Sequence, residues 1–569
     1  MERSDRPHTL VTMCLLAVVV GIVAAAGAWI FKKLIAFFHN ALLLGQFGWS
    51  YDISDYIDVN PWGPGIILVP PLAAIVVAFL VKTYAPEAKG HGVPEVMDAI
   101  HYNEARMRWQ VVVIKAVASS LTIGSGGSAG REGPIIQMGA AMGSVLGAFV
   151  GMPLNQRITL VAAGAGAGIA AAFNAPVGGI LFAVELILIS VNAANLLPVS
   201  LATVVAIWLS RLVEGRSPLI DIPELMVHAG ETLSVWIMLL FVPLGILVGV
   251  LSALFIWSLD KAEDLFDRIP GGYYVQHVFG MFLLGLMIYG LWLYAGHYYV
   301  EGVGYASITQ ILKTILADPV FLLLLMVFKL IATCLTLGSG ASGGVFSPSM
   351  FMGAALGAAF GHLCQAFLPG IEIPIAIFAI AGMAGAVAGG TGAVLTAIAM
   401  TYEMTFDYNS MLPVIAVSVI SLAMRRWLIP ESIYTIKLLR RGHVVPDGLQ
   451  SSVDASRHVD QLMSANFCEC DTGSVTSHQA GQTSIVTTDG TITGVLGPAA
   501  RADADFTKGY IIVEPNASMI PTLQAMDRAG AKIAVVSRDP GSRKFSDVLG
   551  VVTAAEIGAH VGHSSLMLS

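Results

Sequence analysis

The sequence predicts an all-α polytopic membrane protein, made of two inverted-topology repeats with broken helices, that carries a small cytoplasmic α/β domain. Of the 569 residues, 56% are hydrophobic and only 12% are charged, and the mean hydropathy is +0.75, which excludes an ordinary soluble protein. One unusual glycine-rich stretch occurs twice, and the composition becomes polar at about residue 443. We therefore expect a membrane domain over residues 1–442 and the α/β domain over residues 443–569.

Apolar runs long enough to cross about 30 Å of hydrocarbon recur along the membrane part. The first is expected to be a membrane helix rather than a signal peptide, because no clean cleavage site follows it. Shorter apolar segments, several broken by Gly or Pro, lie between the long ones and are tolerated only where their backbone is buried in protein or lines a polar cavity. The clearest long runs are residues 9–30, 64–82, 233–257, 275–296 and 319–338.

Basic residues near the first and last spans place both termini in the cytoplasm, because Lys and Arg accumulate on that side, and we expect the plasma membrane. The five cysteines include no pattern typical of a disulfide framework or a zinc site. No basic patch suggests nucleic acid, and no catalytic motif for a metal or a phosphate indicates an enzyme. The basic residues are Arg3, Arg6, Arg425, Arg426, Lys437, Arg440 and Arg441.

The glycine-rich stretch is an internal repeat. Residues 124–143 read GSGGSAGREGPIIQMGAAMG and residues 338–357 read GSGASGGVFSPSMFMGAALG, and they agree at eleven of twenty positions. In each copy, glycines that permit tight turns precede Pro134 or Pro348, and proline suits the first turn of a helix. Each copy is therefore expected to be a loop that opens a helix. The free N–H groups of a first helical turn attract anions, so two such turns in a membrane would make an anion site.

A second matched pair indicates that the duplication spans two halves of the chain. Residues 163–186 and 381–404 lie 218 residues apart, close to the 214-residue offset of the first pair, and each places a glutamate, Glu185 or Glu403, at the same position. Transport proteins are often built from inverted repeats whose broken helices meet near the middle of the bilayer. Runs of small residues also serve as close-packing surfaces between membrane helices. The matched order and spacing favour the repeat.

The polar C-terminal region predicts a small α/β domain. A strand is expected over residues 510–515, a helix over 517–529, a strand over 532–537 and a strand-to-helix step over 548–561.

Several motifs together resemble the CLC family of chloride channels and proton-coupled chloride transporters, in order through about residues 9–442. The resemblance implies a homodimer in which each subunit has its own pore, assembled from two inverted halves and holding unhydrated anions at helix ends. The motifs are GHGVPE (90–95), GREGP (130–134), AAAFNAPVGGILFAVE (170–185), GGVFSP (343–348) and the late Tyr434.

The resemblance also implies roles for single residues. Glu132 matches the gating glutamate, whose carboxylate occupies an anion site when the pore is shut and leaves it, or takes a proton, when an anion replaces it. The backbone N–H groups of Val345 and Phe346 and the hydroxyl of Tyr434 would bind the central anion. The full set of anion-binding residues implied is His91, Gly92, Arg131, Gly133, Val345, Phe346 and Tyr434.

Two residues depart from the family's pattern. His91 stands where the family usually has an anion-binding serine, so it can keep anion binding, change selectivity, add pH dependence, or turn aside to a nearby carbonyl. Leu186 stands where the exchangers commonly carry an inner glutamate, so the usual internal proton relay is absent. Glu185, Glu403 or water would have to replace it, although Glu185 is more simply a structural carboxylate. Lys115, which matches a family lysine, either raises anion occupancy or extends to the membrane interface.

We predict passive or weakly proton-coupled chloride conduction, with a proton-coupled chloride or fluoride antiporter as the alternative. The expected partners are chloride and other small anions, protons, the lipid bilayer and a second copy of the chain, and no cofactor is expected. Residues 443–569 resemble a shortened pair of CBS modules, in which Thr553 and Glu556 stand where the ribose of a nucleotide could be contacted. The first module lacks the corresponding residues, which favours dimer contact over the binding of an adenine nucleotide.

Overall fold

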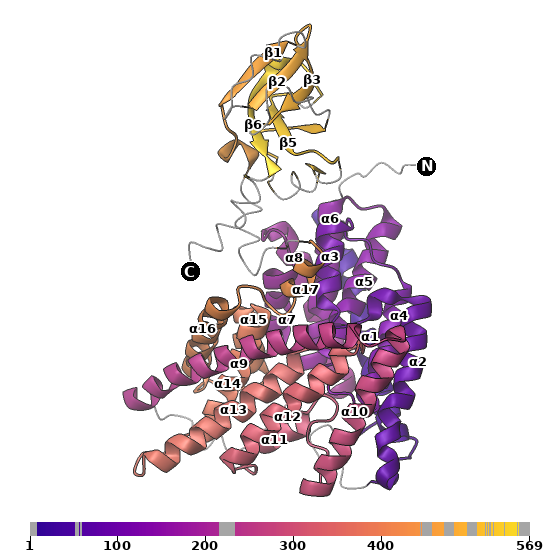
Figure 1. Cartoon of the computed structure of the whole chain (residues 1–569), viewed down its shortest axis with the longest axis vertical. Helices are drawn as coiled ribbons and strands as arrows, with labels where there is room; N and C mark the ends of the chain where they lie inside the picture. The colour runs from indigo at the N-terminus through magenta and orange to yellow at the C-terminus, as the bar shows by residue number, and fades with distance from the viewer. Residues whose placement is uncertain are drawn as a thin grey trace. The chain divides into compact units, whose positions relative to one another are not determined.

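The computed structural model describes residues 8–443 apart from 52–55, 57–59 and 216–233, together with Val445 and parts of the polar C-terminal region. These parts are residues 458–471, 483–497, 509–517, 529–539, 541–554 and the single residues Met519, Thr522, Ala525, Met526 and Glu556. Arg3, Arg6 and parts of the predicted segments 517–529 and 548–561 lie outside the described residues. The chain divides into two compact units, Met1–Gly448 and Leu449–Ser569, and each is described by itself (Figure 1).

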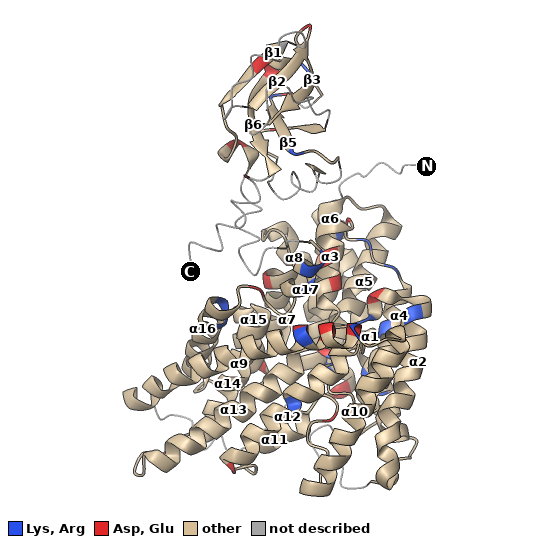
Figure 2. Ribbon diagram, viewed as in Figure 1, with Lys and Arg blue, Asp and Glu red and all other residues tan. Residues whose placement is uncertain are grey.

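Long apolar helices dominate the first unit, and ten of them among the described residues are long and apolar enough to cross a membrane. Each of the five long runs expected from the sequence overlaps one of these helices. Figure 2 shows that charged residues are sparse along them. The ten are α1 (Leu10–Leu42), η1 with α2 (Gly63–Leu68 and Val69–Tyr84), α5 (Glu132–Val150), α6 (Leu154–Phe173), α8 (Ala193–Glu214), α9 (Val235–Asp267), α10 (Gly272–Ala295), α12 (Pro319–Gly338), α13 (Phe346–Phe367) and α16 (Met411–Leu428).

Shorter helices lie between the long ones, as the broken apolar segments predict. Two of the breaks match across the repeat: Asn174 ends α6 with φ +60° and Gly392 ends α14 with φ +82°, and both conformations suit a helix C-terminus. A short helix follows each break. The shorter helices are η2 (Pro86–Ala88), α3 (Val93–Tyr102), α4 (Gln110–Gly124), α7 (Pro176–Phe182) with the π-helical turn η3 (Ala183–Ile187), α11 (Tyr305–Leu312), α14 (Ile375–Thr391), α15 (Val394–Thr405) and α17 (Thr435–Arg440).

Glycines bring the paired helices of each half into close contact. A Cβ atom on Gly139 of α5 would lie 2.1 Å from the carbonyl oxygen of Gly164 in α6, and one on Gly353 of α13 would lie 2.2 Å from that of Gly382 in α14. The small-residue runs are therefore close-packing surfaces as well as copies of a repeat. Both crossings occupy the same place in their half of the chain.

The second unit contains two three-stranded sheets with one topology. In the order β1-β2-β3 and again in β4-β5-β6, the first pair of strands is parallel and the second antiparallel. The two sheets share an apolar core that includes Ile485 and Val535. The strands β4, β5 and β6 agree with the strands expected from the sequence, whereas the first sheet was not predicted. The strands are β1 (Phe467–Asp471), β2 (Thr483–Thr488), β3 (Thr491–Leu496), β4 (Tyr510–Val513), β5 (Ile533–Ser537) and β6 (Val548–Thr553).

Candidate functional site

The two copies of the glycine-rich repeat meet directly. Gly130 and Gly344 form an isolated antiparallel bridge, in which each N–H donates to the carbonyl oxygen of the other at 2.7 Å. Glycine is required at position 344 of this contact, because a Cβ on Gly344 would lie 2.8 Å from the backbone nitrogen of Gly133. The bridge places the starts of α5 and α13 next to each other.

Three helices begin at this place, and none of them is capped by the side chain of its own N-cap residue. Gly92, Arg131 and Val345 are the N-cap residues of α3, α5 and α13, and none of the three N-termini has a side-chain cap hydrogen bond from its own N-cap residue. Helix α3 packs against α5, and α5 packs against α13. The first-turn N–H groups and the positive ends of the helix dipoles therefore converge on one region, which attracts negative charge.

Glu132 supplies that negative charge. Its side chain is fully buried at the first position of α5, and its carboxylate accepts a hydrogen bond from the backbone N–H of Ser347 at 3.4 Å. The hydroxyls of Ser347 and Tyr305 also donate to it, the latter at 3.2 Å. The carboxylate of α5 thus occupies the N-terminus of α13, where a bound anion would otherwise lie.

His91 lies in the loop before α3, outside the spanning helices, and is 3% exposed. Its ring nitrogens make no hydrogen bond to any described residue, and Nε2 lies 3.8 Å from Oε1 of Glu263. Burial, followed by the positive charges of Lys437, Lys115 and Arg441, lowers the pKa of His91 well below its usual value, so the ring is neutral. A neutral imidazole offers one N–H donor to an anion.

The backbone on either side of His91 joins the loop to the start of α5. Gly92 has φ +89°, and a Cβ on it would lie 2.8 Å from the carbonyl oxygen of Gly133. A Cβ on Gly133 would lie 2.1 Å from the carbonyl oxygen of His91. The structure therefore brings the predicted residues His91, Gly92, Gly133 and Glu132 together.

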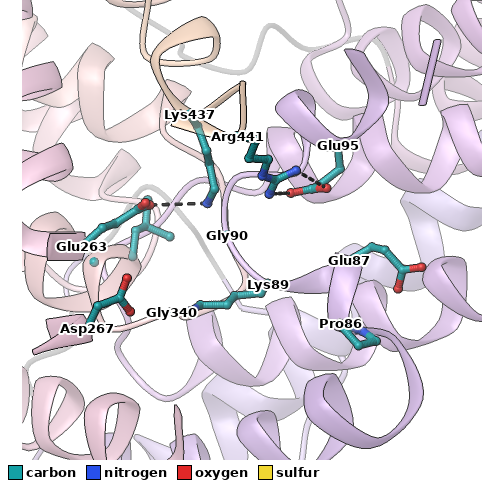
Figure 3. A pocket seen from close by; sticks show the side chains of 12 residues that line it. Pro86, Glu87, Lys89, Gly90, Glu95, Glu263, Asp267, Gly340, Lys437 and Arg441 are labelled. Carbon is teal, nitrogen blue, oxygen red and sulfur yellow. Dashed lines mark hydrogen bonds and ion pairs between the residues drawn. The ribbon is translucent and has the colours of Figure 1, made fainter. Parts of the chain in front are cut away.

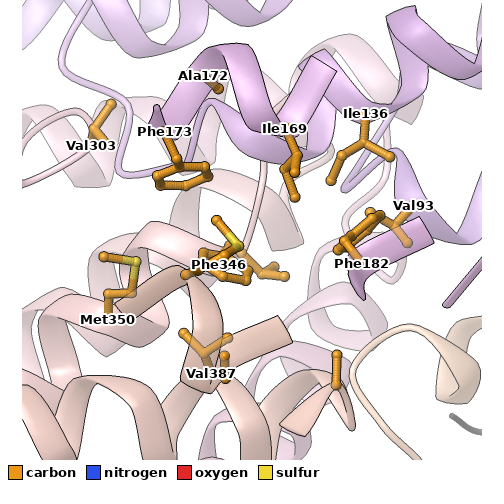
Figure 4. Packing of buried hydrophobic residues seen from close by; sticks show 14 of the residues in the cluster. Val93, Ile136, Ile169, Ala172, Phe173, Phe182, Val303, Phe346, Met350 and Val387 are labelled. Carbon is orange, nitrogen blue, oxygen red and sulfur yellow. The ribbon is translucent and has the colours of Figure 1, made fainter. Parts of the chain in front are cut away.

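Apolar side chains surround the helix starts. Phe346 packs against Phe173 with ring centroids 5.6 Å apart, and Figure 4 shows Val93, Ile136 and Phe182 close to them. Val345 and Tyr434 are also buried. In this dry environment, electrostatic interactions are stronger than in water.

Lysines hold the two loops that approach the site. Lys115 of α4 is fully buried and donates to the carbonyl oxygens of Ala88 at 3.0 Å and Gly90 at 2.7 Å. Lys329 of α12, also fully buried, donates to those of Val300 and Gly302, both at 3.0 Å. Lys115 does not extend to a membrane interface. It fixes the loop that carries His91.

The two matched glutamates bind helix starts in the opposite halves. Glu185 accepts from the backbone N–H groups of Leu395 at 2.9 Å and Thr396 at 2.7 Å, at the start of α15. Glu403, which lies in α15, accepts from those of Val177 at 3.0 Å and Gly178 at 2.8 Å, at the start of α7. The contacts are reciprocal. Leu186, next to Glu185, is buried and has no group that can carry a proton.

Two polar cavities approach the site. The first, of about 740 Å³, is lined by Arg131, Tyr305, Lys32, Lys33 and Glu214 among others. The guanidinium of Arg131 donates to the carbonyl of Ala172 at 3.1 Å, while its Nε has no hydrogen-bond partner among the described residues. Cations outnumber acids on this wall, which favours the entry of anions.

The second cavity, of about 380 Å³, lies beside Gly90 (Figure 3). Its charges are mixed, and two ion pairs cross it: Lys437 Nζ lies 3.4 Å from Glu263, and Arg441 Nη2 lies 2.5 Å from Glu95. Glu87, Lys89 and Asp267 complete the charged lining.

Three residues of the site were missed in the sequence, although the repeat contains a signal for each. Tyr305, Lys329 and Ser347 stand 214 residues after His91, Lys115 and Gly133, which is the offset of the first matched pair. Applying that offset to every candidate residue of the first half would have found them.

The known proteins that this chain resembles agree with the geometry. The sequence model of the family described as "Voltage gated chloride channel" matches residues 73–426. The chain belongs to the CLC family. It is therefore a multi-pass integral membrane protein. An H⁺/Cl⁻ exchange transporter ClcA from Salmonella arizonae is 31% identical over 440 residues, which are 77% of this chain and 90% of the relative. The ClcA of Citrobacter koseri is 32% identical over the same shares of the two chains.

Solved CLC structures share the fold. A slow cyanobacterial Cl⁻/H⁺ antiporter superposes with a TM-score of 0.66 at 28% identity, over 77% of this chain and 99% of its own. A eukaryotic CLC transporter, at 17% identity and a TM-score of 0.65, is matched over 96% of this chain and 98% of its own. The likeness to the eukaryotic protein shows the fold alone.

Proposed function

We propose that this CLC protein carries chloride across the membrane through a pore gated by Glu132, either passively or with weak proton coupling. The observation that supports this proposal is that the Glu132 carboxylate accepts hydrogen bonds from the N–H and hydroxyl of Ser347 at the start of α13 and from the hydroxyl of Tyr305 at the start of α11. A carboxylate and a chloride ion have the same charge and compete for the N–H groups at the start of α13. Protonation removes that charge, so protons and chloride both favour opening. The family's anion-binding residues, with His91 in place of serine, line the same region.

The weak proton coupling rests on Leu186 and Glu185. Leu186 cannot accept a proton, and both carboxylate oxygens of Glu185 already accept N–H groups of α15. Glu403 has the same arrangement at α7. Leu186, Glu185 and Glu403 therefore offer no free carboxylate for an internal proton relay.

Proton-coupled exchange is the second candidate function. It is favoured by the relatives, which are named H⁺/Cl⁻ exchange transporters. Exchange of fluoride for protons has a weaker basis, because the fluoride/proton antiporter among the solved structures is only 23% identical, with a TM-score of 0.59, and shows the fold alone.

One experiment separates these functions. The full-length protein is reconstituted into liposomes with a chloride gradient, and chloride and proton fluxes are recorded together. Chloride flux with little proton movement supports the proposal. Uphill proton movement at a fixed ratio to chloride would assign the protein to the exchangers. The same assay with fluoride or nitrate in place of chloride shows which anion the protein transports best.

The arrangement in the cell follows from the proposal. We place both termini in the cytoplasm of a homodimer in the plasma membrane, because Arg425, Arg426, Lys437, Arg440 and Arg441 cluster near the end of the membrane part. The cavity at Arg131 would then open to the outside and the cavity at Gly90 to the cytoplasm. We assign no enzymatic activity to the chain.

The C-terminal unit is proposed to be a pair of CBS modules that serves in dimer contact. Its two sheets have the same strand order and strand directions, as a tandem pair requires. Thr553 and Glu556 bind each other: the N–H of Thr553 donates to the carboxylate at 2.8 Å, and the N–H of Glu556 donates to the hydroxyl at 3.1 Å. This capping box occupies the groups that a ribose would need. Calorimetry of the full-length protein with ATP, ADP and AMP should show no binding.

A further inference from the structure

Two hydroxyl groups lie on the carboxylate of Glu132. The Tyr305 hydroxyl donates to Oε1 at 3.2 Å, the Ser347 hydroxyl donates to the same oxygen, and the two hydroxyl oxygens are 3.2 Å apart. Glu132 and Ser347 are fully buried and Tyr305 is 3% exposed, so water does not compete for these bonds. We call Tyr305 and Ser347 the hydroxyl pair.

Neither hydroxyl depends on Glu132 for its position. Tyr305 is the first residue of α11 and follows the loop whose carbonyls Lys329 binds. The guanidinium of Arg131 lies over the tyrosine ring, 5.1 Å from its centroid. The backbone of Ser347 lies in the first turn of α13, and its hydroxyl oxygen is 3.2 Å from that of Tyr305. The hydroxyl pair is therefore in place before the carboxylate binds, and little ordering is needed to form the bonds.

We propose that the hydroxyl pair holds Glu132 in its closed position and limits how often the gate opens. The inference rests on the proposed function, since it requires Glu132 to be the gate. A hydrogen bond to a charged group is shorter and stronger than one between neutral groups. Each hydroxyl therefore lowers the fraction of time that the carboxylate spends away from α13. Tyr305 and Ser347 act as positioning residues, because they act on transport through Glu132.

The test removes one oxygen atom at a time. Tyr305→Phe and Ser347→Ala are each reconstituted as full-length protein, and chloride flux is measured against chloride concentration. At low chloride, each variant should raise the flux per protein by about tenfold, because a hydrogen bond to a charged group contributes roughly that factor to an equilibrium. The half-saturating chloride concentration should fall by a similar factor, because the carboxylate that competes with chloride is held less tightly.

Matched controls remove hydroxyls that do not touch Glu132. Tyr298 is 1% exposed and its hydroxyl has no hydrogen-bond partner among the described residues. Ser349 lies in α13, and its hydroxyl donates to the carbonyl oxygen of Val345 at 2.9 Å. Tyr298→Phe and Ser349→Ala should both keep wild-type flux. If losing any buried hydroxyl loosened the fold and raised the flux, these two variants would show the same increase.

A second background shows whether the hydroxyl pair acts through Glu132. In Glu132→Ala, no carboxylate remains to be held, so adding Tyr305→Phe or Ser347→Ala should change the flux no further. If Tyr305→Phe or Ser347→Ala raised the chloride flux equally in the Glu132→Ala background, the proposal would be overturned. A lower maximal flux with a higher half-saturating chloride concentration would also overturn it, because the hydroxyls would then be anion ligands. If wild-type protein carries chloride but Tyr305→Phe and Ser347→Ala match it, only the hydroxyl-pair proposal fails. Absence of chloride flux in the wild type would instead reject the proposed function.

Discussion

Gly130 and Gly344 occupy the same position in the two copies of the repeat, and they exchange backbone hydrogen bonds of 2.7 Å in both directions. When residue i binds residue j and j binds i in the same way, the two segments are related by a two-fold rotation. This contact therefore lies on the symmetry axis between the halves, beside the start of α13. The symmetry axis therefore lies beside Glu132, the proposed gate.

Gly344→Ala should prevent the two repeats from meeting. The added methyl group would lie 2.8 Å from the backbone nitrogen of Gly133 and 3.0 Å from the carbonyl oxygen of Gly130. Packed backbone atoms cannot move aside as the end of a flexible side chain can. We expect loss of monodisperse protein in size-exclusion chromatography after detergent extraction.

Gly290→Ala is the control for this change. Nothing lies within 4 Å of the Cβ it would add to α10, and alanine stabilises a helix interior by about 1 kcal/mol relative to glycine. Normal yield from Gly344→Ala would show that the bridge tolerates a wider spacing than the structure has.

Glu132→Gln should uncouple chloride flux from pH. Glutamine keeps the size of the side chain but carries no charge at any pH, so acid no longer changes the competition with chloride. The measurement is chloride efflux from proteoliposomes over a pH series, with the exposed Glu372→Gln as the control. A pH profile like that of the wild type would remove Glu132 from the gate.

Glu185→Gln should lower stability without changing proton movement. The carboxylate accepts two backbone N–H groups and the hydroxyl of Thr396, and an amide presents one acceptor and one unsuited donor. The loss should be about 2 kcal/mol, seen as a lower melting temperature in detergent. Proton flux relative to chloride should match the wild type, and a selective loss of proton flux would identify Glu185 as a relay instead.

His91→Ser should change anion preference and leave the pH profile alone. Serine is smaller than the buried imidazole, so nitrate flux should rise relative to chloride. Because burial lowers the pKa of His91 well below its usual value, its ring is neutral near neutral pH and its removal takes away no titrating charge there. A shifted pH profile would mean that the ring does titrate near neutral pH.

The sequence was informative wherever a feature is local. Pro134 and Pro348 predicted the starts of α5 and α13, and the helices begin two residues earlier, at Glu132 and Phe346. The acid in the first turn was visible in the sequence as well. What Glu132 binds was not, because its donors Tyr305 and Ser347 lie 173 and 215 residues away.

The ends of helices were harder to predict than their apolar centres. The apolar run over residues 233–257 ends ten residues before helix α9 does, at Asp267. The apolar signal ends where Asp260 and Glu263 begin, but charged residues do not stop a helix that leaves the hydrocarbon. Glu263 on this extension lies near His91, so the missed segment forms part of the cavity at Gly90.

The reciprocal contacts of Glu185 and Glu403 affect how the protein is made. The N–H groups that Glu185 binds lie 210 residues further along the chain, which is roughly 10 to 40 s of synthesis. Until then, Glu185 lacks the N–H groups of α15 that it binds in the folded protein. The first turn of α7 likewise lacks the carboxylate of Glu403. The first half therefore cannot complete its fold until the second half has been synthesised.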